Sequence, residues 1–132
     1  MRIQVKDFMS APVKTAVPGN TVSEIRDIMN KYDIHCVPIV EYEKQLPDPN
    51  VTIKGIVTGS DVLNNKDGNV KASDLTELRK VHIINKNSSA HAAAEMMLRH
   101  EVHHLIVMDE GEIIGVISSL DFVKLVAKHS IG

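Results

Sequence analysis

The sequence predicts an α+β fold built from two repeats, each in the order β-α-β-β-α. The first observation is a motif that occurs twice: residues 55–61 read Gly-Ile-Val-Thr-Gly-Ser-Asp, and residues 115–121 read Gly-Val-Ile-Ser-Ser-Leu-Asp. The second observation is that matching helix and strand patterns precede both copies. A chain of 132 residues holds two half-domains that bury enough apolar surface only by packing together. We therefore expect repeat one over 1–68 and repeat two over 69–132.

Repeat one is predicted to begin with a strand over 13–17, closed by a Pro-Gly-Asn turn. The sequence of residues 21–24, Thr-Val-Ser-Glu, then has the form of a capping box, which indicates a helix that begins there. Two strands, 35–40 and 52–57, are expected next, followed by the motif and a short helix. The apolar face of the first helix is predicted from its spacing: Val22, Ile25, Ile28 and Met29.

Repeat two follows the same order. A strand over 81–84 leads to a helix that is capped by Ser88 or Ser89. Strands over 103–108 and 113–117 are predicted to form a hairpin, and residues 120–128 form the last helix. The apolar face of the first helix in this repeat is predicted to carry small and flexible residues: Ala90, Ala93, Ala94, Met96 and Met97.

Composition and charge exclude several classes of function. The net charge is −2 and no run of Lys or Arg exceeds two residues, which argues against binding to nucleic acid or to a membrane surface. Aromatic residues make up only 3% of the chain, so base stacking is not expected either. The apolar runs are short, and we expect no membrane span, no signal peptide and a cytoplasmic location. The single cysteine, Cys36, agrees with a reducing compartment and reads as a small buried apolar residue.

Each motif places a hydroxyl and a carboxylate directly after an apolar strand. Thr58 and Ser118 would lie at a helix N-terminus, where free backbone N–H groups favour a phosphate. Asp61 and Asp121, one helical turn further on, can each accept two hydrogen bonds from a vicinal diol such as a ribose. The glycine and the apolar residues before them would offer a flat wall for a purine. The motif therefore predicts a nucleoside phosphate site, with a simple helix cap as the alternative.

Three features of the sequence carry a resemblance to a known family: the paired motif, the order of elements and the segment Ile34-His35-Cys36-Val37-Pro38. From about Val5 to Ala127, the chain resembles a tandem pair of CBS (cystathionine beta-synthase) domains, a Bateman module. The resemblance implies two repeats related by a pseudo-two-fold axis, with clefts between them for adenosine derivatives such as AMP, ADP, ATP or S-adenosylmethionine. It implies a stand-alone regulatory module for energy sensing that forms a homodimer and signals to an effector protein. The adenine nucleotide is expected as a regulatory ligand and not as a required cofactor. Few Lys or Arg lie in the motif segments, which favours a monophosphate or a nucleoside over ATP, and AMP is the ligand we expect.

Carried over position by position, the resemblance assigns nucleotide contacts in both repeats. Asp61 and Asp121 would hold ribose hydroxyls, and Thr58 and Ser118 would lie near ribose or phosphate. His35 and His103 would contact a phosphate, with Ser60 and Ser119 beside the motif carboxylates completing the set. The expected adenine contacts are Thr15, Ala16, Val17, Cys36, Val37 and Pro38 in one cleft, and Ile83, Ile84, Asn85, His104, Leu105 and Ile106 in the other.

The second copy departs from the pattern, because Ile106 replaces the proline at position 38 and Ser118 replaces Thr58. We therefore expect the first site to be the better preserved.

Other constellations in the sequence predict less. The seven histidines match no compact zinc spacing, so we expect no metal site. There is no Gly-x-Ser-x-Gly elbow and no oriented nucleophile and base, so we expect no catalytic residues and no enzyme activity. Helical segments 90–97 and 122–127 leave apolar surface that could bind a second copy. The alternative functions are a dimerisation or protein-interaction module with vestigial pockets, or a sensor of S-adenosylmethionine.

Overall fold

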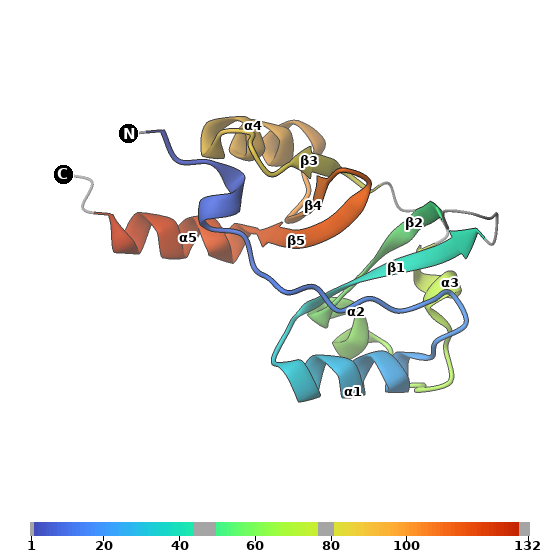
Figure 1. The fold of residues 1–132 in the computed structure, drawn as a ribbon. Coiled ribbons are helices and arrows are strands. Elements are labelled where there is room, and N and C mark those ends of the chain that lie inside the picture. Colours follow the sequence, from blue (N-terminus) through green and yellow to red (C-terminus); the bar gives the residue numbers. More distant parts are fainter. Residues whose placement is uncertain (1, 44–49, 77–80, 130–132) are drawn as a thin grey trace. The chain divides into compact units, whose positions relative to one another are not determined.

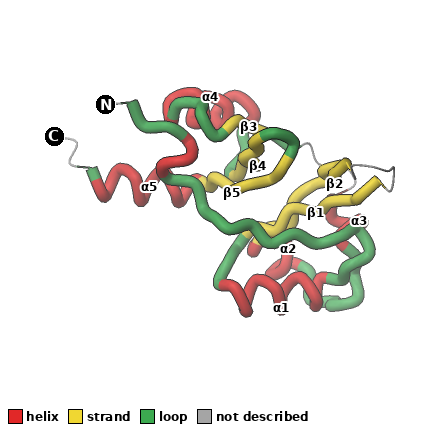
Figure 2. The backbone as a smooth tube through the Cα atoms, viewed as in Figure 1, coloured by secondary structure: helices red, strands yellow, loops and turns green. Residues whose placement is uncertain are grey.

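A computed structural model describes residues 2–43, 50–76 and 81–129, drawn in colour in Figure 1. Small sheets flanked by helices confirm the predicted α+β class (Figure 2). The chain forms two compact units, one within Lys14–Val81 and the other made of Met1–Val13 together with His82–Gly132. The units therefore differ from the sequence repeats, since the N-terminal residues pack with the second motif. None of the described helices is long and apolar enough to span a membrane.

The unit within Lys14–Val81 contains an antiparallel hairpin and three helices. Strands β1 (Cys36–Glu43) and β2 (Asn50–Thr58) pair over their whole length, with a register shift between Ile39 and Val40. Its helices are α1 (Val22–Tyr32), α2 (Gly59–Asn64) and α3 (Ala72–Thr76). The strands predicted over 35–40 and 52–57 and the two predicted helices of this repeat are confirmed, while α3 was not predicted.

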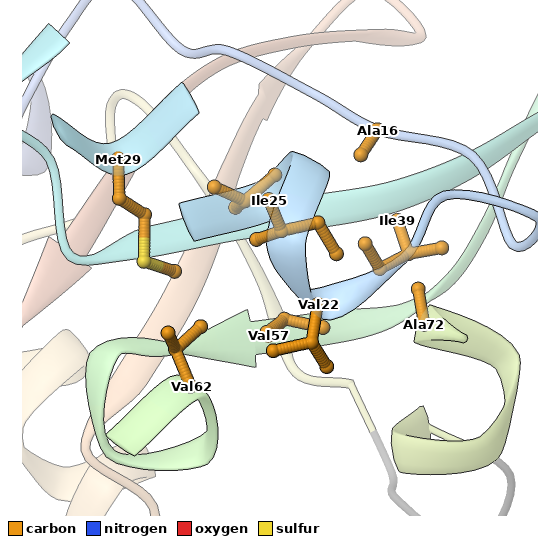
Figure 3. Close-up of a cluster of buried hydrophobic side chains, with 9 residues drawn as sticks. Ala16, Val22, Ile25, Met29, Ile39, Val57, Val62 and Ala72 are labelled. Carbon is orange, nitrogen blue, oxygen red and sulfur yellow. The ribbon is translucent and has the colours of Figure 1, made fainter. Parts of the chain in front are cut away.

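The capping box of α1 is confirmed. The Thr21 hydroxyl accepts the backbone N–H of Glu24 at 3.2 Å, and Glu24 Oε1 accepts the backbone N–H of Thr21 at 3.0 Å. The helix ends where Asp33 adopts a left-handed conformation. Its apolar face packs on the hairpin to form the core of this unit, shown in Figure 3: Ala16, Val22, Ile25, Met29, Ile39, Val57, Val62 and Ala72.

The predicted strand over 13–17 is wrong in extent, because only Ala16 pairs, in parallel with Ile39. The Ala16 N–H donates to the carbonyl of Pro38 at 3.0 Å, and the Val40 N–H donates to the carbonyl of Ala16 at 2.8 Å. Extension of this parallel pairing toward residue 14 would need an N–H from Pro38, and extension toward residue 18 would need an N–H from Pro18. Proline has no N–H, so the ladder stops at a single bridge.

The second unit contains a three-stranded sheet in the order β3-β4-β5. Strand β3 (Ile83–Asn85) is parallel to β4 (His104–Asp109), which is antiparallel to β5 (Glu112–Ser118). Helix α4 (Ala90–His100) lies between β3 and β4 in the chain, and α5 (Ser119–Lys128) follows β5. The strand predicted over 81–84 is observed over 83–85, so it begins two residues later and ends one residue later. Of the two predicted caps for α4, the structure uses Ser89, whose hydroxyl accepts the Ala92 N–H at 3.0 Å.

The N-terminal segment is an integral part of this unit. A short 3-10 helix (Val5–Asp7) brings Val5 into the core, where the side chain is fully buried. The Val5 N–H donates to the carbonyl of Ser88 at 2.8 Å, and the Phe8 ring packs edge-on against Phe122 of α5, with 5.0 Å between centroids. Local sequence patterns do not predict that the N-terminal residues pack with the second motif.

Candidate functional site

The first motif joins the end of β2 to the start of α2 through a hydrogen-bonded pair. Asp61 Oδ2 accepts the Thr58 backbone N–H at 2.8 Å and the Thr58 hydroxyl at 3.0 Å. The Asp61 N–H in turn donates to Thr58 Oγ1 at 3.4 Å, which completes a capping box. Asp61 is only 9% exposed, so these bonds hold a nearly buried carboxylate in a fixed position.

Backbone hydrogen bonds bring the three predicted segments of this unit together. The Gly59 N–H donates to the carbonyl of His35 at 2.8 Å, and Cys36 pairs with Thr58 across the hairpin. The bridge from Ala16 to Ile39 places the segment 15–17 on the other side of β1. Residues 15–17, 35–38 and 58–61 therefore form one continuous region of this unit.

Within this region, side chains differ in what they can contact. Val37 and Pro38 are fully buried and Ala16 nearly so, which leaves backbone groups for any ligand contact at these three positions. Val17, His35 and Ser60 are exposed, and Thr15 is half-buried. Burial, and secondarily the charge of Asp61, raises the pKa of Cys36 to about 12. Cys36 is therefore a neutral thiol near the motif carboxylate.

The motif glycines are required by close packing, a role that the sequence analysis missed. A Cβ at Gly55 would lie 2.6 Å from Cβ of Thr76 in α3, and a Cβ at Gly115 would lie 2.6 Å from Sδ of Met9. The expected flat wall for a purine is therefore covered by another chain segment on the side of these glycines. A glycine inside a predicted strand is itself a signal of such close approach.

The second motif repeats this geometry at the junction of β5 and α5. Asp121 Oδ2 accepts the Ser118 backbone N–H at 2.8 Å and the Ser118 hydroxyl at 3.2 Å, and the Asp121 N–H donates to Ser118 Oγ at 3.3 Å. Across the sheet, the Ser119 N–H donates to the carbonyl of His103 at 3.0 Å. Asp121 is 7% exposed.

Two contacts are described in the second motif in addition to this shared pattern. The Ser119 hydroxyl lies 3.1 Å from Nδ1 of His103. The Ser10 hydroxyl, from the N-terminal segment, donates to Asp121 Oδ1 at 3.1 Å. Sequence reasoning missed Ser10, because nothing in the local pattern places residue 10 beside residue 121.

The remaining predicted residues of this unit lie on β3 and β4. Ile83 pairs with Ile106, and the Ile106 N–H donates to the carbonyl of His82 at 3.0 Å. Ile83 is exposed, and the Asn85 side chain accepts the Asn87 N–H at 2.8 Å. His104 is half-buried. Three of the predicted residues have buried side chains, so only their backbone groups can contact a ligand: Ile84, Leu105 and Ile106.

The described residues contain no group of three or more His, Cys, Asp or Glu side chains that could hold a metal ion. The imidazole rings of His82 and His100 stack with 4.0 Å between centroids. Neither ring belongs to the motif regions.

Comparison with known proteins finds relatives that match most of the chain. The CBS domain-containing protein YhcV of Bacillus subtilis is 25% identical over 97% of this chain and 89% of its own length. A solved CBS domain pair in complex with 5′-methylthioadenosine and S-adenosyl-L-methionine superimposes with a TM-score of 0.78 at 24% identity, covering 97% of this chain and 98% of that one.

A third similar structure is the CBS domain of a bacterial CNNM/CorC family Mg²⁺ transporter in complex with ATP. It has a TM-score of 0.73 at 17% identity, and the match covers 97% of this chain and 89% of that one. These solved structures share the fold described above. The sequence model of the CBS domain matches residues 5–68 and again residues 72–128. With two copies covering most of its length, the chain belongs to the CBS domain family.

Proposed function

We propose that this chain is a regulatory module that binds an adenosine nucleotide at each of its two motifs. The observation that carries the proposal is that the same hydrogen-bonded arrangement occurs in both units. In each, a nearly buried carboxylate is fixed by the N–H and hydroxyl of the residue that ends a strand. In each, the first helical N–H is bonded to a histidine carbonyl on the neighbouring chain segment.

The ligand class is supported by similar solved structures, which hold S-adenosylmethionine, 5′-methylthioadenosine or ATP. These compounds share adenine and a ribose. A carboxylate accepts hydrogen bonds from both hydroxyls of a ribose, and this is the role we assign to Asp61 and Asp121. Neither motif contains a Lys or Arg between its glycine and its aspartate, so we favour AMP, with its single phosphate, as the ligand.

The other site residues divide by exposure. The exposed imidazoles of His35 and His103 are available to a phosphate. Adenine would be recognised through backbone N–H and carbonyl groups of segments 15–17 and 36–38 in one unit, and of 83–85 and 104–106 in the other. The role is non-catalytic: bound nucleotide changes how the module packs as a homodimer or against an effector protein in the cytoplasm.

A second candidate function, a protein-interaction module with vestigial sites, is supported by helix α5. Leu120, Val123 and Val126 follow one another at three-residue steps, and each is more than half exposed. Such an apolar stripe suits contact with another protein. The carboxylates would then act only as helix caps.

Isothermal titration with AMP, ATP and S-adenosylmethionine distinguishes the two functions. We expect heat of binding from the wild-type chain, loss of one site in Asp61→Ala and loss of the other in Asp121→Ala. Glu24→Ala is the matched control, because Glu24 closes the same type of capping box on α1 outside both motifs. Binding should survive in Glu24→Ala. Absence of heat for all three compounds at millimolar concentration would leave the interaction module as the function.

A further inference from the structure

The hydroxyl of Ser10 donates a hydrogen bond to Asp121, the carboxylate that would bind the ribose in the second motif under the proposed function. Ser10 Oγ lies 3.1 Å from Asp121 Oδ1 and 3.4 Å from Oδ2. Oδ2 also accepts the N–H and the hydroxyl of Ser118. We propose that Ser10 is an internal competitor of the ribose and lowers the affinity of the Asp121 site for an adenosine nucleotide. This inference rests on the proposed function and adds a residue that controls one of its two sites.

The backbone of the N-terminal segment holds Ser10 in place. The Ser10 N–H donates to the carbonyl of Val116 at 2.9 Å, and the Val116 N–H donates to the carbonyl of Ser10 at 3.0 Å. Beside this pair, Met9 lies directly over Gly115, where even a methyl group would collide with Sδ. Since the backbone is already ordered by these contacts, the hydroxyl binds Asp121 with little further loss of conformational entropy.

The same geometry allows Ser10 to release Asp121 without unfolding the segment. Ser10 is an exposed residue, and rotation about its Cα–Cβ bond to another staggered position would move the hydroxyl toward solvent. The two backbone hydrogen bonds to Val116 do not depend on that rotation. Opening of the site therefore exchanges the hydrogen bond to Asp121 for one to water, and only the small net difference between the two is lost.

A ribose can replace the serine because it offers more donors. A serine hydroxyl has a single proton, which the two oxygens of Asp121 share at 3.1 and 3.4 Å. A vicinal diol has two protons and can donate one to each oxygen. The apparent dissociation constant is then the intrinsic one divided by the fraction of molecules in which Ser10 has turned away. Removal of the hydroxyl should raise that fraction.

The test is a titration of AMP into a chain in which Asp61→Ala has removed the other proposed site. In that background, Ser10→Ala is expected to tighten AMP binding by roughly three- to tenfold. Ser10→Thr keeps the hydroxyl and should bind AMP as the parent does. With 2′,3′-dideoxy-AMP, which lacks the ribose diol, Ser10→Ala should give no gain in affinity.

The outcomes separate this inference from the proposed function. An unchanged or weaker affinity for AMP in Ser10→Ala overturns the competition while AMP binding itself stands. An equal gain with 2′,3′-dideoxy-AMP also overturns it, because Ser10 would then act on something other than the ribose. If neither protein takes up AMP, ATP or S-adenosylmethionine, the proposed role of Asp121 is wrong, and the competition is wrong with it.

Discussion

Replacing Gly55 by alanine should destabilise the chain more than replacing Gly19, which faces open space. The new Cβ would lie 2.6 Å from Cβ and 2.8 Å from Cγ2 of Thr76. Thr76 is buried, and its hydroxyl donates to the Ala72 carbonyl at 3.0 Å. Its Cβ is attached directly to the backbone of α3, so no side-chain rotation relieves the collision. Either α3 or β2 must move.

The magnitude follows from two opposing effects. Overpacking of a well-filled core costs about 1–3 kcal/mol. Alanine also restricts the unfolded chain relative to glycine, which returns about 0.4–1 kcal/mol. Taking the middle of each range, about 2 kcal/mol less about 0.7 kcal/mol, we expect Gly55→Ala to lower the free energy of unfolding by about 1.3 kcal/mol. At Gly115 the first atom met is Sδ of Met9, the flexible part of a long side chain, so the loss there should be smaller.

Urea denaturation followed by circular dichroism measures both changes. Gly19→Ala is the control, since a Cβ there meets nothing within 4 Å and the stability should change by less than about 0.5 kcal/mol. Adding Met9→Ala should recover part of the loss in Gly115→Ala, whereas Thr76→Ala leaves the colliding Cβ in place and should not rescue Gly55→Ala. If Gly55→Ala proves as stable as Gly19→Ala, the close approach of α3 to β2 is wrong.

Three further predictions concern single side chains. Hydrogen bonds from the backbone and hydroxyl of Thr21 lower the pKa of Glu24 below its ordinary value of 4.5. Above about pH 4.5, the wild-type chain should therefore be more stable to urea denaturation than Glu24→Gln. This difference in stability should vanish as the pH falls through the lowered pKa. Because the pKa of Cys36 is raised to about 12, its thiol should react with Ellman's reagent at pH 8 far more slowly than a denatured control, and equal rates would contradict the partial burial of this side chain. Val5→Ala should cost about 1–3 kcal/mol in urea denaturation, because Val5 is fully buried among residues of the C-terminal unit; a negligible loss would show that the N-terminal segment does not belong to that core.

Local patterns in the sequence were sufficient to predict most helices and strands. The capping box at Thr21 and Glu24 and the serine cap at Ser89 are contained within four residues, so sequence spacing alone indicates them. The hairpin strands were predicted in the same way, from apolar runs separated by turn residues. The arrangement within each motif, a hydroxyl bonded to a carboxylate three residues later, is also local.

Contacts between distant segments could not be predicted from these patterns. The place of Val5 in the C-terminal core and the contact of Ser10 with Asp121 both join residues at least 79 positions apart. The single bridge at Ala16 depends on which residues of β1 lie opposite, and therefore on the register that makes Pro38 the missing donor. Periodicity indicates which face of an element is buried and does not indicate which segment covers it.

A crystal structure of the chain grown with saturating AMP would show directly whether each motif binds a nucleotide through its carboxylate. We predict a nucleotide at each motif, with its ribose hydroxyls about 3 Å from the carboxylate oxygens of Asp61 and Asp121. In the second motif, the Ser10 hydroxyl should have turned away from Asp121. A structure in which AMP is absent, or binds with its ribose remote from both carboxylates, would contradict the ribose-binding role of Asp61 and Asp121.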